Sequence, residues 1–173
     1  ADDNEFEESL DAVVMIAGAS DSEISDDEND LLNQMKGWSD RNRSIPDSRA
    51  IALTKWLQER LKPDGNWNDQ RVIIFTEYRA TQNWIIDVLT SSGLGDADRL
   101  MMLYGGMDKN QREKIKAAFQ SSPSISPVRV LVATDAASEG IDLQNHCSLM
   151  VHLEIPWNPN KLEQRNGRID RHG

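Results

Sequence analysis

A chain of 173 residues with 38% hydrophobic side chains can bury the core of one domain, and it is too short for two full domains. The formal net charge of −10 arises in the first thirty residues, which hold twelve Asp or Glu and no Lys or Arg. The rest carries 17 acidic against 19 basic side chains, so its net charge does not oppose contact with phosphate.

Cysteine content, apolar runs and histidine spacing argue against a disulfide-stabilised protein, a membrane protein and a metal-binding protein. The single cysteine, Cys147, excludes an internal disulfide framework and fits a reducing compartment, so we expect a cytoplasmic protein, or a nuclear one in a eukaryote. No apolar run approaches the roughly 20 residues of a membrane span, so we expect no membrane partner. The histidines match no ligand spacing, and we expect no metal site.

Residues 1–44 are expected to form an acidic leader or linker that is partly ordered, because acidic runs with few apolar residues bury too little surface to fold. One apolar island at residues 13–17 can dock as a short helix or strand. The first clear element is a helix over residues 47–61. Asp47 or Ser48 can cap it, leucines recur at near-helical spacing, and Pro63 stops it.

Four short apolar runs, rich in branched residues, predict strands that are buried on both faces. They cover residues 71–76, 100–104, 128–134 and 148–155. Helical patterns follow the first two runs, the second opening with a capping box at Asp108, and a last helix is expected from about Asn160. Strands alternating with helices predict an α/β domain with a mostly parallel sheet and helices on both faces.

Polar loops follow each predicted strand, where the ligands of such sheets bind. In "VATDAASEGIDLQ" (132–144), Asp142 can accept hydrogen bonds from ribose and Thr134 can hold phosphate. An ordinary strand-to-loop turn, in which Asp135 or Ser138 caps a helical turn, explains this stretch equally well. The chemistry of the stretch alone leaves both interpretations open.

The last seventeen residues, "WNPNKLEQRNGRIDRHG", concentrate three arginines at a spacing of three. At 100° per residue, Gln164, Arg168 and Arg171 share one helix face, and Arg165 at its boundary can instead brace a neighbouring acid. Favourable placement at a helix C-terminus explains one or two of these arginines. Guanidinium groups bind phosphate bidentately, so we interpret the face as directed at phosphate. A glycine at 167, within the helix, indicates close approach to the backbone there.

Several of these stretches resemble motifs of superfamily-two helicases and translocases. "VATDAASEGIDL" resembles motif V, "QRNGRIDRHG" motif VI, "IIFTEY" motif IV, and "LYGGM" the family's Gly-Gly region. The triplet Trp157-Asn158-Pro159 resembles a sequence typical of the Swi/Snf-like branch, including its bacterial RapA-like members. The match spans about residues 45–173.

The resemblance implies the second RecA-like lobe of a two-lobed motor, a three-layer α/β domain. ATP would lie between the lobes, with Arg168 and Arg171 as arginine fingers and Gln164 at the cleft. The remaining site residues expected are Gly140, Asp142 and Arg165 for the nucleotide, and Thr134, Tyr78, Gly105 and Gly106 for nucleic acid.

Two motifs of such motors do not occur in this sequence: the Gly-x-x-x-x-Gly-Lys-Thr/Ser loop and the Asp-Glu magnesium motif. We therefore expect ATP and Mg²⁺ to be held mainly by a first lobe of a longer ATPase, and we expect no ATP turnover by this chain alone. The expected substrate is double-stranded DNA. Two alternatives stay open: a non-catalytic module that binds nucleic acid or protein, and the lobe of an RNA helicase, whose motif V is also similar.

Overall fold

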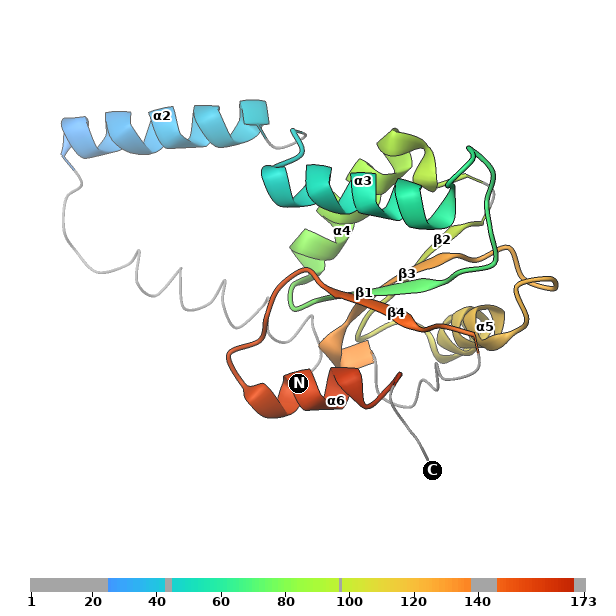
Figure 1. Cartoon of the computed structure of the whole chain (residues 1–173). Helices are drawn as coiled ribbons and strands as arrows, with labels where there is room; N and C mark the ends of the chain where they lie inside the picture. The colour runs from blue at the N-terminus through green and yellow to red at the C-terminus, as the bar shows by residue number, and fades with distance from the viewer. Residues whose placement is uncertain (1–24, 43–44, 97, 138–145, 170–173) are drawn as a thin grey trace.

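The computed structural model describes residues 25–42, 45–96, 98–137 and 146–169. Its centre is a four-stranded sheet in the order β2-β3-β1-β4, and every neighbouring pair is parallel (Figure 1). The strands are β1 (Val72–Thr76), β2 (Leu100–Leu103), β3 (Val130–Thr134) and β4 (Leu149–His152). All four predicted strands are therefore present, and β4 is shorter than the apolar run that predicted it.

Alternating side chains of the two central strands form two separate cores. On β1, Val72 and Ile74 face one cluster, whereas Ile73 and Phe75 face the other. Both central strands are buried along their whole length, as expected when helices cover both faces of a parallel sheet. This arrangement confirms the predicted α/β class.

Two helices, α3 (Ser48–Leu61) and α4 (Arg79–Leu89), cover one face of the sheet (Figure 1). The Asp47 carboxylate accepts a hydrogen bond from the backbone N–H of Ala50 at 2.8 Å, which confirms the predicted cap. The predicted leucine face of α3 is buried in the first cluster. Beyond α4, a π-helical turn η1 (Thr90–Leu94) contains Gly93 in the left-handed region, at a φ of 78°.

The opposite face is covered by α5 (Lys109–Gln120), and α6 (Pro159–Asn166) lies on the same side (Figure 1). The Asp108 carboxylate caps α5 by accepting from the backbone N–H groups of Asn110 and Gln111. Phe119 of α5 belongs to the second core cluster, and Ile169, just beyond α6, packs against it. The fold therefore has three layers, and a short 3₁₀ turn η2 (Asp135–Ala137) follows β3.

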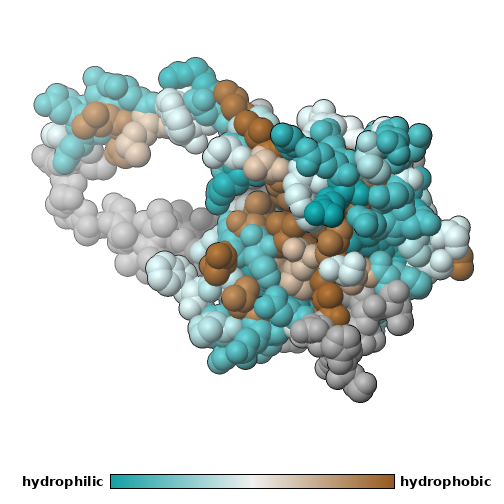
Figure 2. Space-filling view, in the orientation of Figure 1, coloured by the Kyte–Doolittle hydropathy of each residue, from teal (hydrophilic) through white to brown (hydrophobic). Residues whose placement is uncertain are grey.

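A further helix, α2 (Asp26–Asn42), has no buried residue (Figure 1). Figure 2 shows apolar side chains on its surface. These are Leu31, Leu32, Met35 and Trp38, each more than half exposed. The expected boundary between leader and lobe falls at residues 43–44, and most of the predicted leader precedes residue 25, so both lie outside the described residues.

Candidate functional site

Polar side chains gather where the strands end at the carboxyl edge of the sheet. Thr76 and Thr134 are partners in the ladder between β1 and β3, and both are fully buried. β4 ends at His152, and Glu154 follows two residues later. Because all four strands are parallel, the loops after them share this edge, as the sequence predicted.

Glu154 fastens the end of β4 to the loop between β1 and α4. Its carboxylate accepts hydrogen bonds from the Thr76 hydroxyl at 3.0 Å, the Glu77 backbone N–H at 2.8 Å and the Thr81 hydroxyl at 3.0 Å. Three donors satisfy most of the acceptor capacity of one carboxylate. Glu154 therefore holds the start of α4 against the sheet edge.

Arg165 of α6 is buried at the same edge, with 1% of its surface exposed. Its Nε and Nη2 donate to the two carboxylate oxygens of Asp135 at 2.5 and 2.8 Å, a bidentate ion pair. Nη1 donates to the backbone carbonyl of Glu154 at 2.8 Å, and the guanidinium lies 5.3 Å from the centre of the Phe75 ring. The side chain therefore joins α6 to the turn after β3 and to the end of β4.

Of the two roles considered for Arg165, the structure shows the bracing one. Its guanidinium is directed at Asp135 and enclosed by protein, so it presents no surface to a nucleotide. The expectation that Arg165 binds nucleotide receives no support from this geometry and stays a prediction. Breaking such a pair on one side leaves a buried charge without its partner, which costs roughly 3–5 kcal/mol.

His152 and Lys161 complete the network around this pair. The His152 Nε2 lies 3.2 Å from the side-chain oxygen of Asn166, and its Nδ1 lies 3.4 Å from Nη1 of Arg165. Burial, followed by the nearby Arg165 charge, lowers the pKa of His152 below its usual 6.5. Lys161 Nζ lies 3.4 Å from Glu77 and 3.9 Å from Asp135, so Asp135 is shared between two cations.

The arginine stretch is not one continuous helix. α6 ends at Asn166, and the chain then tightens, with the backbone N–H groups of Arg168 and Ile169 donating three residues back, to Arg165 and Asn166. The expected face, drawn at 100° per residue, is therefore corrected over residues 167–169. Gly167 is the C-cap, and a Cβ there would lie 3.3 Å from the carbonyl oxygen of Glu163.

Arg168 differs from Arg165 in its contacts. Its side chain is half-buried, and its buried Nε has no hydrogen-bond partner among the described residues. Buried donors are normally paired, so the unpaired Nε distinguishes Arg168 from Arg165, whose donors are engaged within the protein. Gln164 is exposed on α6. The three other predicted nucleotide residues, Gly140, Asp142 and Arg171, lie outside the described residues.

The residues predicted to meet nucleic acid also follow the strands. Tyr78, at the start of α4, is 43% exposed, whereas Thr134 is fully buried at the end of β3. Gly105 and Gly106 follow β2, and Gly106 has a φ of 76°, a conformation that favours glycine. The side chain of Arg79 lies near these loops, with its guanidinium 3.4 Å from the centre of the Tyr104 ring.

Sequence reasoning missed much of this network. Asp135 was considered only as a helix cap, and neither Glu154 nor Lys161 was singled out. A usable signal existed, because both acids come just after strands. The contact of Glu154 with the end of β1 could not be anticipated, since it requires β1 and β4 to be neighbours, and neither could the pairing of Asp135 with Arg165 of α6.

The carboxylates at this edge are already engaged within the protein. The carboxylates of Asp135 and Glu154 are engaged by Arg165 and by hydroxyl groups. Among the described residues, no group of three or more His, Cys, Asp or Glu could hold a metal ion.

The three-layer parallel sheet, with an arginine-bearing helix closing its carboxyl edge, defines a RecA-like lobe. Residues 53–173 match the helicase conserved C-terminal domain. The chain therefore belongs to this family and is the C-terminal lobe of a superfamily-two helicase, as the motifs indicated.

Two relatives and one solved structure illustrate the similarity. The chain is 41% identical over 105 residues to the uncharacterized ATP-dependent helicase YqhH of Bacillus subtilis, covering 61% of this chain and 17% of that protein. It is 34% identical over 103 residues to the ATP-dependent RNA helicase eIF4A of Botryotinia fuckeliana, covering 60% of this chain and 24% of that protein.

The crystal structure of the C-terminal part of the Fun30 ATPase domain superposes with a TM-score of 0.56 at 20% identity. The superposition covers 75% of this chain and 38% of that one. This likeness confirms the fold. The aligned part of the chain spans about a fifth of each curated relative, and no helix in the described part is long and apolar enough to cross a membrane.

Proposed function

We propose that this chain is the second motor lobe of an ATP-dependent translocase, which supplies Arg168 and Arg171 to ATP held by a first lobe. The observation that supports this most strongly is the contrast within α6 and the turn after it. Arg165 is bonded to Asp135 and to the carbonyl of Glu154, whereas the Nε of Arg168 has no hydrogen-bond partner among the described residues. An arginine that the surrounding frame does not engage in this way is suited to an incoming anion.

Arg168 would act on the charge of the transferring γ-phosphate. ATP bound to the first lobe supplies that group, with Mg²⁺ held mainly by the same lobe. Phosphoryl transfer depends on positioning and charge stabilisation, and an arginine finger contributes roughly 10³–10⁵ in rate. The pair between Arg165 and Asp135 would keep the end of α6 in place while the lobes close.

The remaining predicted contacts are part of the same proposal. Gln164 is exposed on α6 and would line the cleft beside the fingers. Gly140 and Asp142 would approach the nucleotide sugar. Thr134, Tyr78 and the pair Gly105-Gly106 would meet the nucleic-acid backbone, with Tyr78 as the most exposed side chain among them.

Turnover in the parent protein tests the finger assignment. Arg168→Ala and Arg171→Ala should each lower kcat for ATP by about 10³-fold or more, with nucleotide affinity retained. Arg49→Ala is a matched control, because that arginine is 65% exposed at the start of α3 and pairs only with Asp47 among the described residues. Near-normal turnover in both finger variants would refute the assignment.

The proposed substrate is duplex DNA, and an RNA substrate is the second candidate. The similarity to proteins named as ATP-dependent RNA helicases supports the second candidate, whereas the Trp157-Asn158-Pro159 triplet favours the first. Stimulation of the parent ATPase by duplex DNA and by RNA of equal length, at equal salt, separates them. Stronger stimulation by RNA would overturn the choice of DNA and leave the finger assignment intact.

A further inference from the structure

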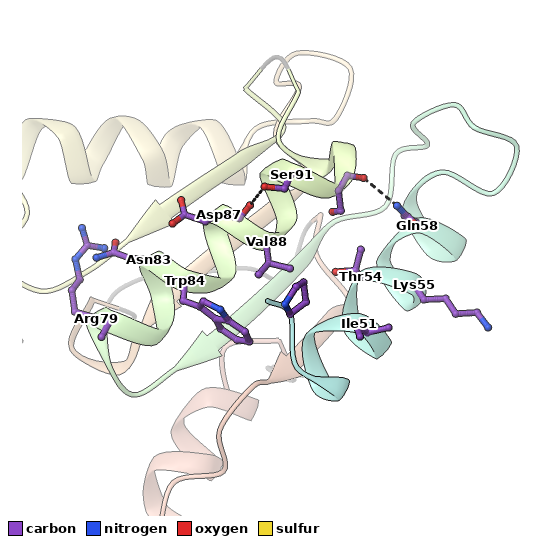
Figure 3. Close-up of a pocket in the computed structure, with 13 residues that line it drawn as sticks. Ile51, Thr54, Lys55, Gln58, Arg79, Asn83, Trp84, Asp87, Val88 and Ser91 are labelled. Carbon is purple, nitrogen blue, oxygen red and sulfur yellow. Dashed lines mark hydrogen bonds between the residues drawn. The ribbon is translucent and has the colours of Figure 1, made fainter. Parts of the chain in front are cut away.

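A groove separates α3 from α4 on the face of the sheet opposite α5, outside the carboxyl-edge network. It has a volume of about 930 Å³. Its walls include Ile51, Thr54, Lys55 and Gln58 from α3, and Trp84 and Val88 from α4 (Figure 3). One end is closed by the hydrogen bond from Gln58 Nε2 to the carbonyl of Ser92 at 3.1 Å.

The walls of this groove combine exposed apolar surface with a cation. Ile51 is 59% exposed, and Trp84 and Val88 project from α4 towards α3 (Figure 3). Lys55 carries the positive charge on the α3 side. A groove between two helices that offers apolar side chains among polar ones is a suitable site for a third helix with an apolar stripe.

The chain itself carries such a helix. On α2, Leu31, Met35 and Trp38 recur at helical spacing, which places them on one face, and Leu32 lies beside them. Exposed fractions are 59% for Leu31, 67% for Met35 and 64% for Trp38. Four large apolar side chains on one exposed helix form a patch of the kind that marks an interaction surface.

The stripe and the groove match in length and in charge. Leu31 to Trp38 and Ile51 to Gln58 each span seven residue steps, about 10 Å along a helix. If α2 runs antiparallel to α3, its acidic first turn meets the basic end of α3. The acids are Asp26, Asp27 and Glu28, and the bases are Arg60 and Lys62.

The short segment between α2 and α3 favours α2 of the same chain as the helix that occupies the groove. α2 ends at Asn42 and α3 begins at Ser48, so five residues join them, within the usual length for antiparallel helix pairs. A link this short gives a millimolar effective concentration. We propose that α2 folds back antiparallel to α3 and docks its apolar stripe, Leu31, Met35 and Trp38, into the groove between α3 and α4.

Chemical cross-linking of the full chain tests this docking. With Trp38 opposite Ile51 and Leu31 opposite Gln58, Gln34 is placed opposite Lys55. Gln34→Cys with Lys55→Cys should give an intramolecular product with a short bis-maleimide at neutral pH. The native Cys147 should not react, because it is 4% exposed and burial raises the pKa of its thiol to about 11.

Two matched variants decide the outcome. Asn33→Cys with Lys55→Cys places the first thiol on the far side of α2 and should cross-link at least about tenfold less. Met35→Asp added to the first pair should cause a similar loss, because one buried apolar side chain shifts an equilibrium by that factor. α2 has no buried residue, so neither change disturbs the core.

Equal cross-linking in the three variants, or none in the first, would overturn the proposal. Products joining two chains, in a yield that rises with protein concentration, would show that the groove takes α2 of a second copy and would also overturn the folding back. None of these outcomes depends on nucleotide or on a first lobe.

Discussion

The two edges of the sheet each bury arginines, and they do so in different ways. At the carboxyl edge, Arg165 pairs with the carboxylate of Asp135. At the amino edge, Arg71 is also 1% exposed, yet its donors meet backbone carbonyls, including those of Val128 at 3.0 Å and Ser126 at 3.3 Å. Burial lowers the pKa of Arg71 from its usual value.

The neighbouring Arg129 follows the pattern of Arg71. It immediately precedes β3, as Arg71 precedes β1, and donates to the carbonyls of Asn68 and Ser126 at 2.6 and 2.9 Å. Its ion pair with Asp69 involves a largely exposed carboxylate. The amino edge therefore uses arginine to close loops. The carboxyl edge uses a carboxylate to hold Arg165, and within the described part of the chain it leaves the Nε of Arg168 without a hydrogen-bond partner.

The largest expected effect on stability comes from Arg71→Met. The variant leaves the carbonyls of Val128, Phe119, Ser121 and Ser126 without their donor, so we expect the free energy of unfolding to fall by roughly 5 kcal/mol. Urea denaturation followed by circular dichroism measures it. The exposed Arg49→Met is the control, and a loss for Arg71→Met no larger than in that control would contradict the loop-closing role.

Arg165→Met is expected to cost less, about 3 kcal/mol. Removing one member of the buried pair leaves Asp135 facing a thioether, but Lys161 at 3.9 Å and the partial exposure of Asp135 soften the loss. A double-mutant cycle with Asp135→Ala should give a coupling energy above about 1 kcal/mol. Additive losses would mean that the two side chains stabilise the fold independently.

Glu154→Gln should cost about 1–2 kcal/mol. The amide oxygen can keep the Thr76 and Glu77 donors, which share one carboxylate oxygen, but its NH₂ group then faces the Thr81 hydroxyl, which donates to the other oxygen. Thermal denaturation detects the change, and Glu163→Gln, on the exposed side of α6, serves as the control. Equal midpoints for the two variants would show that Glu154 does not fasten the edge.

The smallest effect is the contribution of His152 to the pH dependence of stability. Its pKa in the folded protein lies below 6.5, so the unfolded chain binds more protons once the pH falls below that value. Stability should therefore decrease as the pH falls from about 6.5 through the lowered pKa of His152. Above about pH 6.5 this contribution should be constant. His152→Gln should flatten that part of the profile of unfolding free energy against pH. An unchanged profile would contradict a contribution from His152.

Much of the fold could be predicted because its signals are local. Buried strands appear as apolar runs, and the leucines and Asp47 of α3 define that helix and its start. The end of α6 could not be predicted in this way, because Gly167 is compatible both with a helix interior and with a cap. The partner of Arg165 depends on which strands are neighbours, and Arg71 looks like a surface charge before an apolar run.

The central claim is that Arg165 supports the fold of the carboxyl edge while Arg168 is kept for a ligand. The free energy of unfolding of Arg168→Leu, measured on this chain alone by urea denaturation, tests it most directly. Because the buried Nε of Arg168 has no partner among the described residues, we predict a value within about 0.5 kcal/mol of the unsubstituted chain, or higher. A loss of about 2 kcal/mol or more would contradict the claim, since it would show that Arg168 is itself part of the frame.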